Sequence, residues 1–138
     1  MPWVYPDRVT LERPVIADIT LGDEDAGAIV SITLDLQGTE HRGTAVGSAD
    51  VRERPRLVGE AALRAVESII GGAVDLELLA IATAEIGDTQ VAVAQVRLDP
   101  FDEILVGSAL HKESDADGSW AAARAVMDAL NRRLGAVL

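Results

Sequence analysis

Two copies of a short glycine- and serine-containing motif hold the residues of this chain that could bind a ligand. Val46-Gly47-Ser48-Ala49 recurs as Val106-Gly107-Ser108-Ala109, and an arginine follows each copy at the same distance. Glycine lets a ligand approach the backbone closely, and the N–H groups at the start of a following helix attract carboxylates. Arginine binds a carboxylate through two parallel hydrogen bonds. The pattern therefore predicts a site for a small carboxylate-bearing metabolite, formed by Gly47, Ser48, Gly107, Ser108, Arg64 and Arg124.

The same residues also have structural interpretations that involve no ligand. Each glycine suits a bulge in a strand, and each serine simply fits a sheet. Each arginine suits a solvated helix face or an ion pair with an acid of the other half of the chain. Both interpretations stay open on the sequence.

Side chains arranged for catalysis are scarce. The two histidines, His41 and His111, have no acid–base partner at a recognisable spacing, and the common hydrolase, metalloprotease and nucleotide-binding motifs are missing. The acidic stretch 115–119 is faintly similar to a calcium-binding loop but lacks its final glutamate. We therefore expect no catalytic residue, no metal and no cofactor. A small acid–base enzyme using His41 or His111 is kept as the third interpretation.

The repeated motif belongs to a longer internal repeat. When residues 46–66 are matched with residues 106–126, ten identities fall in a window of 21 residues. Self-similarity at a fixed offset indicates two copies of one structural unit. The repeat thus predicts that the candidate site residues occupy equivalent places in two halves of the molecule.

Hydrophobic periodicity predicts the same element order in both halves. Apolar and polar residues alternate over the strands, and apolar residues recur at spacings of three and four over the helices. Gly71-Gly72 should end the first helix, and Asp99-Pro100-Phe101-Asp102 should form a hairpin turn. The expected strands cover 15–21, 31–36 and 41–46, then 74–84, 91–98 and 104–110; the expected helices run from about 56 to 70 and from 120 to about 135.

These elements predict an α+β fold made of tandem βββα units, about residues 14–71 and 73–135, related by a pseudo-twofold. A three-stranded meander with one helix buries only one face and is marginally stable alone, so the antiparallel sheets should pack against two shared helices. Residues 14–138 then form a single domain of two repeats, 14–72 and 73–138. Residues 1–13 form an N-terminal arm, whose Trp3 and Tyr5 are expected to pack onto another surface.

Composition restricts the class of partner. The formal net charge of -11 repels nucleic acid and anionic membranes. The chain contains no cysteine, which excludes disulfides and thiolate chemistry, and no leader or membrane-spanning stretch is evident. We expect a cytoplasmic protein without nucleic-acid or membrane partners.

The strand-strand-strand-helix plan, repeated over residues 14–134, resembles the C-terminal regulatory domain of 2-isopropylmalate synthase, the leucine-sensing module of that enzyme family. The resemblance rests on this architecture and on the glycine before each loop that leads to a helix. The family's Gly-x-Gly-Pro-x-Asp-Ala stretch corresponds to residues 46–50 and 106–110, which keep a glycine but neither the Gly-Pro nor the Asp-Ala pair. The resemblance implies a domain similar to an amino-acid-binding regulatory domain.

We therefore expect a non-enzymatic module that senses a small molecule or binds another protein, and that assembles as a homodimer or a higher oligomer. A structural homo-oligomerisation domain without a ligand is the second interpretation.

Overall fold

The computed structural model describes residues 13–24, 27–72, 74–115 and 117–137. The predicted N-terminal arm, with Trp3 and Tyr5, lies outside the described residues except for Arg13. The strands are β1 (Val15–Glu24), β2 (Gly27–Leu36), β3 (Thr39–Gly47), β4 (Asp75–Ile86), β5 (Thr89–Asp99) and β6 (Glu103–Leu110). The helical segments are the 3-10 turn η1 (Val51–Glu53) and the helices α2 (Arg54–Ile70) and α3 (Ser119–Val137).

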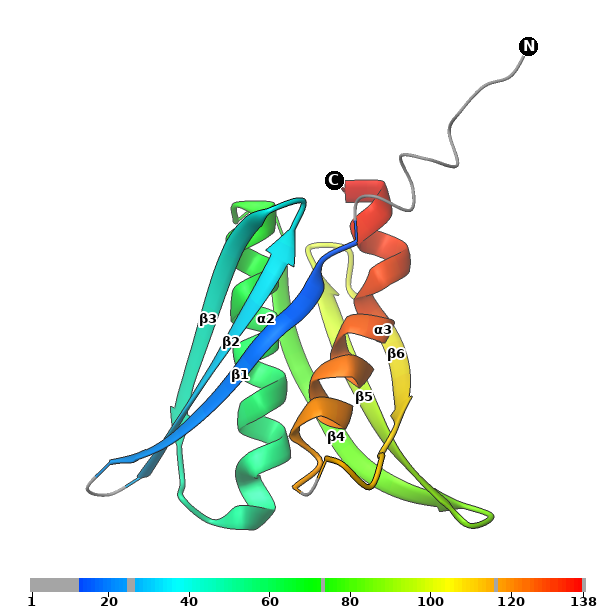
Figure 1. The fold of residues 1–138 in the computed structure, drawn as a ribbon. Helices are drawn as coiled ribbons and strands as arrows, with labels where there is room; N and C mark the ends of the chain where they lie inside the picture. Colours follow the sequence, from blue (N-terminus) through cyan, green and yellow to red (C-terminus); the bar gives the residue numbers. More distant parts are fainter. Residues whose placement is uncertain (1–12, 25–26, 73, 116, 138) are drawn as a thin grey trace.

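Each half of the chain forms its own antiparallel sheet, β1-β2-β3 or β4-β5-β6 (Figure 1). The first strand of each sheet carries a bulge at a matching place, between Ile16 and Asp18 in β1 and between Leu78 and Ala80 in β4. The prediction of an α+β fold with two similar βββα units is confirmed. In each sheet, the two edge strands carry backbone groups that no further strand pairs with, and the inner face must be buried by a helix.

Helix α2 begins and ends where its residue types favour it. The Asp50 carboxylate accepts a hydrogen bond from the Arg52 N–H at 2.9 Å and caps η1, which leads directly into α2. The helix therefore starts slightly earlier than its apolar spacing predicts. Gly71, with φ of 70°, ends it in the left-handed conformation that glycine adopts without strain, as predicted.

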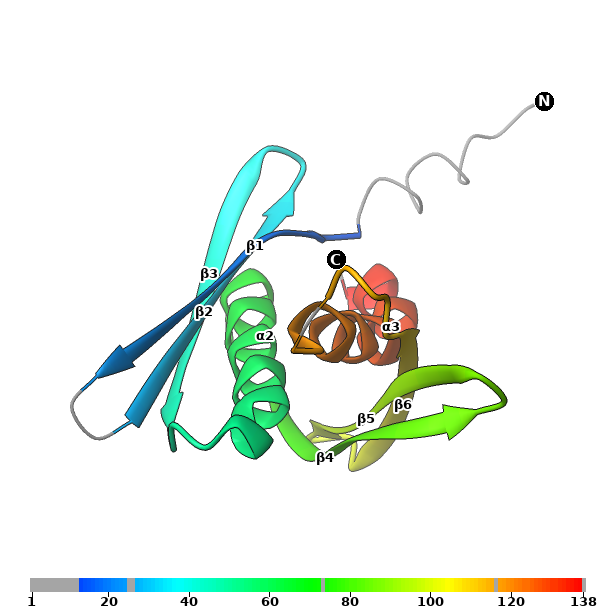
Figure 2. The ribbon, with the colours of Figure 1, turned by 60° about the horizontal axis from the view of Figure 1, so that its bottom comes forward.

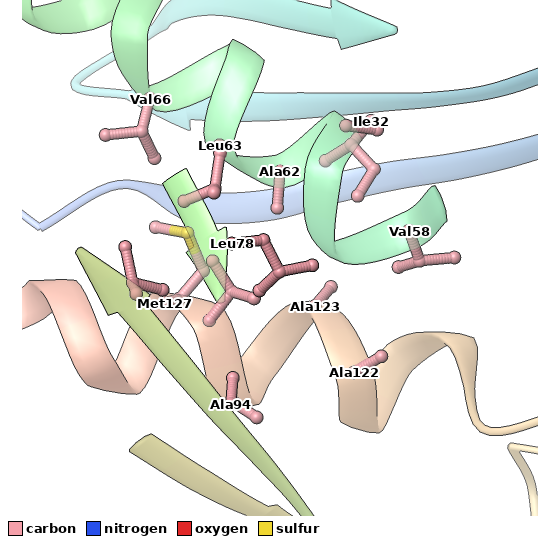
Figure 3. Packing of buried hydrophobic residues seen from close by; sticks show 14 of the residues in the cluster. Ile32, Val58, Ala62, Leu63, Val66, Leu78, Ala94, Ala122, Ala123 and Met127 are labelled. Atoms are coloured by element: carbon pink, nitrogen blue, oxygen red, sulfur yellow. The ribbon is translucent and has the colours of Figure 1, made fainter. Parts of the chain in front are cut away.

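The two helices lie side by side between the two sheets (Figures 1 and 2). Helix α2 packs on β2 and β3, and α3 packs on β5 and β6. Branched side chains such as Ile32, Leu63 and Leu78 meet Met127 and a series of alanines in the interior (Figure 3). Small side chains let helices and sheets approach closely, which produces a dense core. The described helices lack a stretch that is both long and apolar enough to traverse a lipid bilayer.

Two glycines set how closely each helix lies on its own sheet. A Cβ at Gly43 of β3 would overlap the backbone of α2, and a Cβ at Gly107 of β6 would overlap the backbone of α3. Both glycines therefore occupy the same place in their units. The helix residues whose backbones they meet are Ala61 and Ala65 in α2 and Ala125 and Ala129 in α3.

The structural repeat consequently differs from the match of sequence identities. Ala61 corresponds to Ala125 in space, whereas the identities match it with Ala121, so the helices are displaced by about one turn. The expected equivalences of Gly47 with Gly107 and of Arg64 with Arg124 are wrong. Gly107 corresponds to Gly43, and by the same displacement Arg64 corresponds to Asp128.

Candidate functional site

The protein's own side chains surround the first predicted site, at Gly47 and Ser48. Gly47 ends β3 and faces α2, where Cδ2 of Leu57 would lie 2.7 Å from a Cβ at this position. The Ser48 hydroxyl accepts a hydrogen bond from the Asp50 N–H at 3.0 Å. Both residues shape the loop from β3 into η1, and neither lines the grooves described below.

The second predicted site is not at the end of a strand. Gly107 lies inside β6, and the absence of a side chain there lets α3 approach the sheet. Ser108 is exposed, and its N–H donates to Oδ2 of Asp128 at 3.0 Å. Of these two residues, Ser108 borders a groove and Gly107 serves helix packing.

Arg64 and Glu67 of α2 form hydrogen bonds to the backbone of β4, an edge strand of the second sheet. Nη2 of Arg64 donates to the Leu76 carbonyl oxygen at 2.8 Å, and the Leu76 N–H donates to the Glu67 carboxylate at 3.0 Å. Arg56 reaches the Leu78 carbonyl oxygen at 3.4 Å. Because β4 has no strand on this side, these side chains satisfy backbone groups that an edge strand would otherwise expose.

The corresponding edge in the first sheet is open. The matching bulges place Ile16 of β1 where β4 has Leu78, and Pro14 where β4 has Leu76; a proline has no N–H to donate. No hydrogen bond joins β1 to α3 within the described ranges. Where α2 carries Arg56, Arg64 and Glu67, α3 carries Trp120, Asp128 and Asn131.

A groove of about 470 Å³ lies at the place where hydrogen bonds between β1 and α3 are missing within the described ranges. It lies between the start of β1, strand β6 and the outer side of α3. Ile16, Ala109 and Met127 give it an apolar wall, and its polar groups come mostly from α3. A hollow of a few hundred cubic ångströms with an apolar wall and a few polar groups is the usual form of a small-molecule site.

Arg124 is the cation of this groove. Its guanidinium carbon lies 5.4 Å from the centre of the Trp120 ring, and no carboxylate within the described ranges pairs with it. Arg56 and Arg64, by contrast, each pair with a glutamate of their own helix. Arg124 also borders a smaller neighbouring hollow of about 270 Å³, which Lys112 lines as well. Carboxylates line both hollows as well, Asp128 the groove and Asp115 the smaller hollow, but the Asp128 carboxylate accepts the Ser108 N–H and the Asp115 carboxylate accepts N–H groups of α3. The guanidinium of Arg124 is therefore the group that could bind an anion here.

Asn131 also lines this groove. Oδ1 of Asn131 is buried and has no hydrogen-bond partner among the described residues. A buried polar oxygen is destabilising when it lacks a donor, so a ligand donor here would relieve that penalty. Arg124 and Asn131 together could hold a molecule that carries both a carboxylate and a donor group.

Two carboxylates of the acidic stretch, Asp115 and Asp117, cap α3. The buried Asp115 carboxylate accepts hydrogen bonds from the N–H groups of Trp120 at 3.2 Å and Ala121 at 2.8 Å. Oδ1 of Asp117 accepts from the Ser119 N–H at 3.0 Å, and its Oδ2 lies 3.6 Å from Nη1 of Arg54. These carboxylates satisfy the first turn of the helix, where the helix dipole favours negative charge.

We expect the free energy of unfolding to depend on pH through the ionisation of Asp117. Burial raises the pKa of Asp117, but the hydrogen bonds from Ser119 and the charge of Arg54 outweigh burial, so this pKa lies below its ordinary value. A lowered pKa contributes stability that is present above the unfolded-state pKa and is lost as the pH falls through the folded-state pKa. Asp117→Asn should therefore lower the free energy of unfolding by about 1 kcal/mol at pH 7, and by less below about pH 4. Urea denaturation of both proteins between pH 7 and pH 3 measures this, and a pH-independent difference would contradict it.

The two histidines give no support to acid–base catalysis. His111 Nε2 lies 2.7 Å from the backbone carbonyl oxygen of Asp115, a contact that tethers the loop before α3. Within the described ranges, neither His41 nor His111 is hydrogen-bonded to a carboxylate. His111 lines a hollow of about 980 Å³, but Glu85, Asp88 and Glu113 line it too. Those acids disfavour a carboxylate ligand at that place.

Of the six residues that the sequence predicts for a site, Ser108 and Arg124 line the groove between β1 and α3, and the prediction did not include the neighbouring groove residues. Trp120, Asp128 and Asn131 drew no attention because tryptophan, aspartate and asparagine on an amphipathic helix usually have structural roles. The signal that could have found them is the difference between the two halves, since α2 carries ion pairs where α3 does not. No protein-family model matches the chain, and no curated protein is significantly similar to it.

Proposed function

We propose that this protein is a non-enzymatic binding module for a small metabolite that carries a carboxylate and a hydrogen-bond donor on an apolar body. Amino acids and 2-hydroxy acids are the simplest molecules of this class. The observation that carries the proposal is the open groove between β1 and α3, at the place where the other half of the molecule closes the same edge with its own side chains.

Each part of such a metabolite has a counterpart in the groove. Arg124 would bind the carboxylate, because its guanidinium has no acidic partner among the described residues and stacks beside Trp120, which restricts its motion. Oδ1 of Asn131 would accept a hydrogen bond from an amino or hydroxyl group. The apolar body would lie against Ile16 and Met127.

Thermal unfolding with a panel of amino acids and aliphatic hydroxy and oxo acids tests the proposal. A ligand that binds only the folded state, present at 100 times its Kd, adds about 2.7 kcal/mol to the free energy of unfolding. At least one acid of the panel should therefore raise the Tm by several degrees, and its uncharged amide should not. Arg124→Gln should weaken binding of that acid by roughly 10- to 100-fold, as titration calorimetry would measure.

Arg42→Gln is the matched control. Arg42 is also an exposed arginine, but it lies in β3 on the outer face of the first sheet, away from the groove. Its substitution removes the same charge and should leave binding unchanged. An absence of any shift across the panel, or equal binding by the wild type and Arg124→Gln, would refute the proposed function.

A further inference from the structure

The outer face of the second sheet, which points away from both helices, is exposed and mostly apolar, with Gln95 and Ser108 as the uncharged polar residues among its central rows. Strand alternation places Ile104, Val106 and Leu110 of β6 on this face, where they are 55%, 59% and 55% exposed. The neighbouring outward positions of β5 include Val91 and Val93, both half-buried. Single exposed apolar residues are ordinary, but a contiguous apolar surface marks a site of interaction.

The fold itself does not require an apolar surface here. In the first sheet, the middle outward row consists of Thr20, Ser31 and Thr44, with the Ser31 and Thr44 hydroxyls 3.2 Å apart. The next row of that sheet is formed by Asp18, Thr33 and Arg42. The third outward row of the first sheet, Gly22, Ile29 and Val46, is apolar like its counterpart in the second sheet. The two units therefore differ in two of the three rows, and the fold does not require the more apolar character of those two rows in the second sheet.

The face is also free of charge at its centre. Outward positions between 80 and 84 of β4, 91 and 95 of β5 and 104 and 110 of β6 carry no ionisable side chain. The nearest charged row holds Arg97, which lies 3.5 Å from Glu77 and 3.7 Å from Asp102. In a chain with a net charge of -11, this is a surface through which two like-charged copies could approach each other.

We infer that a second copy of this chain covers the apolar face, in a symmetric dimer with sheet packed on sheet. In two of the three rows the side chains grow in size across the face, from Ala84 on β4 to Leu110 on β6 and from Ala80 to Val106, whereas the row of Ala82 ends at Ser108. A twofold axis running along β5 lays β4 of each copy over β6 of the other. In those two rows small side chains then meet large ones, so the face is complementary to itself.

The dimensions of the face suit such a dimer. The three uncharged outward rows, carried on three strands, extend over roughly 14 by 20 Å, given the spacing of residues and strands in a sheet. This is the size of the apolar centre of an interface that buries about 800 Å² on each partner. The Arg97 row would lie at its polar rim. The inference does not depend on ligand binding in the groove.

Sedimentation velocity of the full chain, from low to several hundred micromolar, tests the inference. The wild type should sediment with twice the 14.5 kDa chain mass at the higher concentrations. Val106→Asp places two unpaired charges inside the dimer and should raise its dissociation constant by more than about 100-fold. Val46→Asp is the matched control, because Val46 is 68% exposed on the outer face of the first sheet. It should dimerise like the wild type.

Each other result counts against the inference. A wild type that stays monomeric over the whole range overturns it, as does a dimer that Val106→Asp leaves intact or that Val46→Asp disrupts equally. Circular dichroism identifies a variant that fails to fold, and Leu110→Asp on the same face then takes its place. Because these measurements need no metabolite, their failure is separate from a failure of the thermal-shift panel.

Discussion

Replacing Gly107 by alanine should destabilise the protein by about 3 kcal/mol or more and lower its Tm by roughly 10 °C. The added Cβ would overlap backbone atoms of Ala125 and Ala129, so α3 would have to move away from β6. A backbone cannot rotate out of the way as the end of a side chain can. Gly43→Ala should have an effect of the same size, because the same overlap occurs with α2. Urea denaturation of the purified variants measures both.

Two further glycines serve as controls for this prediction. At Gly22 in β1 a Cβ would meet nothing within 4 Å, so Gly22→Ala should change the free energy of unfolding by less than about 1 kcal/mol. At Gly47 a Cβ would meet only the side chain of Leu57, which can shift. If Gly47→Ala were as damaging as Gly107→Ala while Gly43→Ala were harmless, the structural correspondence of the two halves would be wrong. Full stability of Gly107→Ala would contradict the close packing itself.

Replacing Asp115 by alanine should lower the free energy of unfolding by about 2–3 kcal/mol. Its carboxylate accepts hydrogen bonds from the Trp120 and Ala121 N–H groups, and the residue is only 5% exposed, so water cannot readily replace it. The Ala121 N–H would then be buried without a partner. Thermal and urea unfolding at pH 7 measure the loss.

Asp50→Ala is the matched control for Asp115. Asp50 also caps a helical segment, through the Arg52 N–H, but it is exposed and caps a single 3-10 turn. Water can satisfy the released N–H there, so the loss should be a small fraction of the loss caused by Asp115→Ala. Equal effects of the two substitutions would show that burial of the Asp115 cap contributes little.

The two halves of the molecule have kept one architecture and diverged in what covers their edges and faces. In the first unit, Arg64 and Glu67 of α2 close the edge of β4. In the second unit, α3 leaves the edge of β1 open, and the groove with Arg124 results. The divergence reaches the core as well, where the buried Leu63 of α2 corresponds to the buried Met127 of α3, but it leaves the architecture unchanged.

The amino-acid sequence by itself determined the elements and their order. Apolar and polar residues alternate so regularly in the strands, and recur so regularly at helical spacing in the helices, that local periodicity is enough to place them. Glycines and aspartates in turns and caps mark the ends, as Gly71 does for α2 and Asp115 for α3. These signals act between residues close in the sequence, so no knowledge of packing is needed.

Tertiary structure alone decided which residues of the two halves correspond. Alanines recur every four residues in both helices, so sequence identities can accumulate with the helices matched one turn out of place. The turn between β5 and β6 is also longer than the turn at Gln37 and Gly38 between β2 and β3, which shifts the chain further. The contacts of Gly43 and Gly107 with helix backbones remove this ambiguity, because a backbone fits closely against a sheet only where a glycine faces it. The groove beside Arg124 also depends on the packing of elements far apart in the sequence. It forms where the edge of β1 lies next to α3 and no hydrogen bond joins the two within the described ranges.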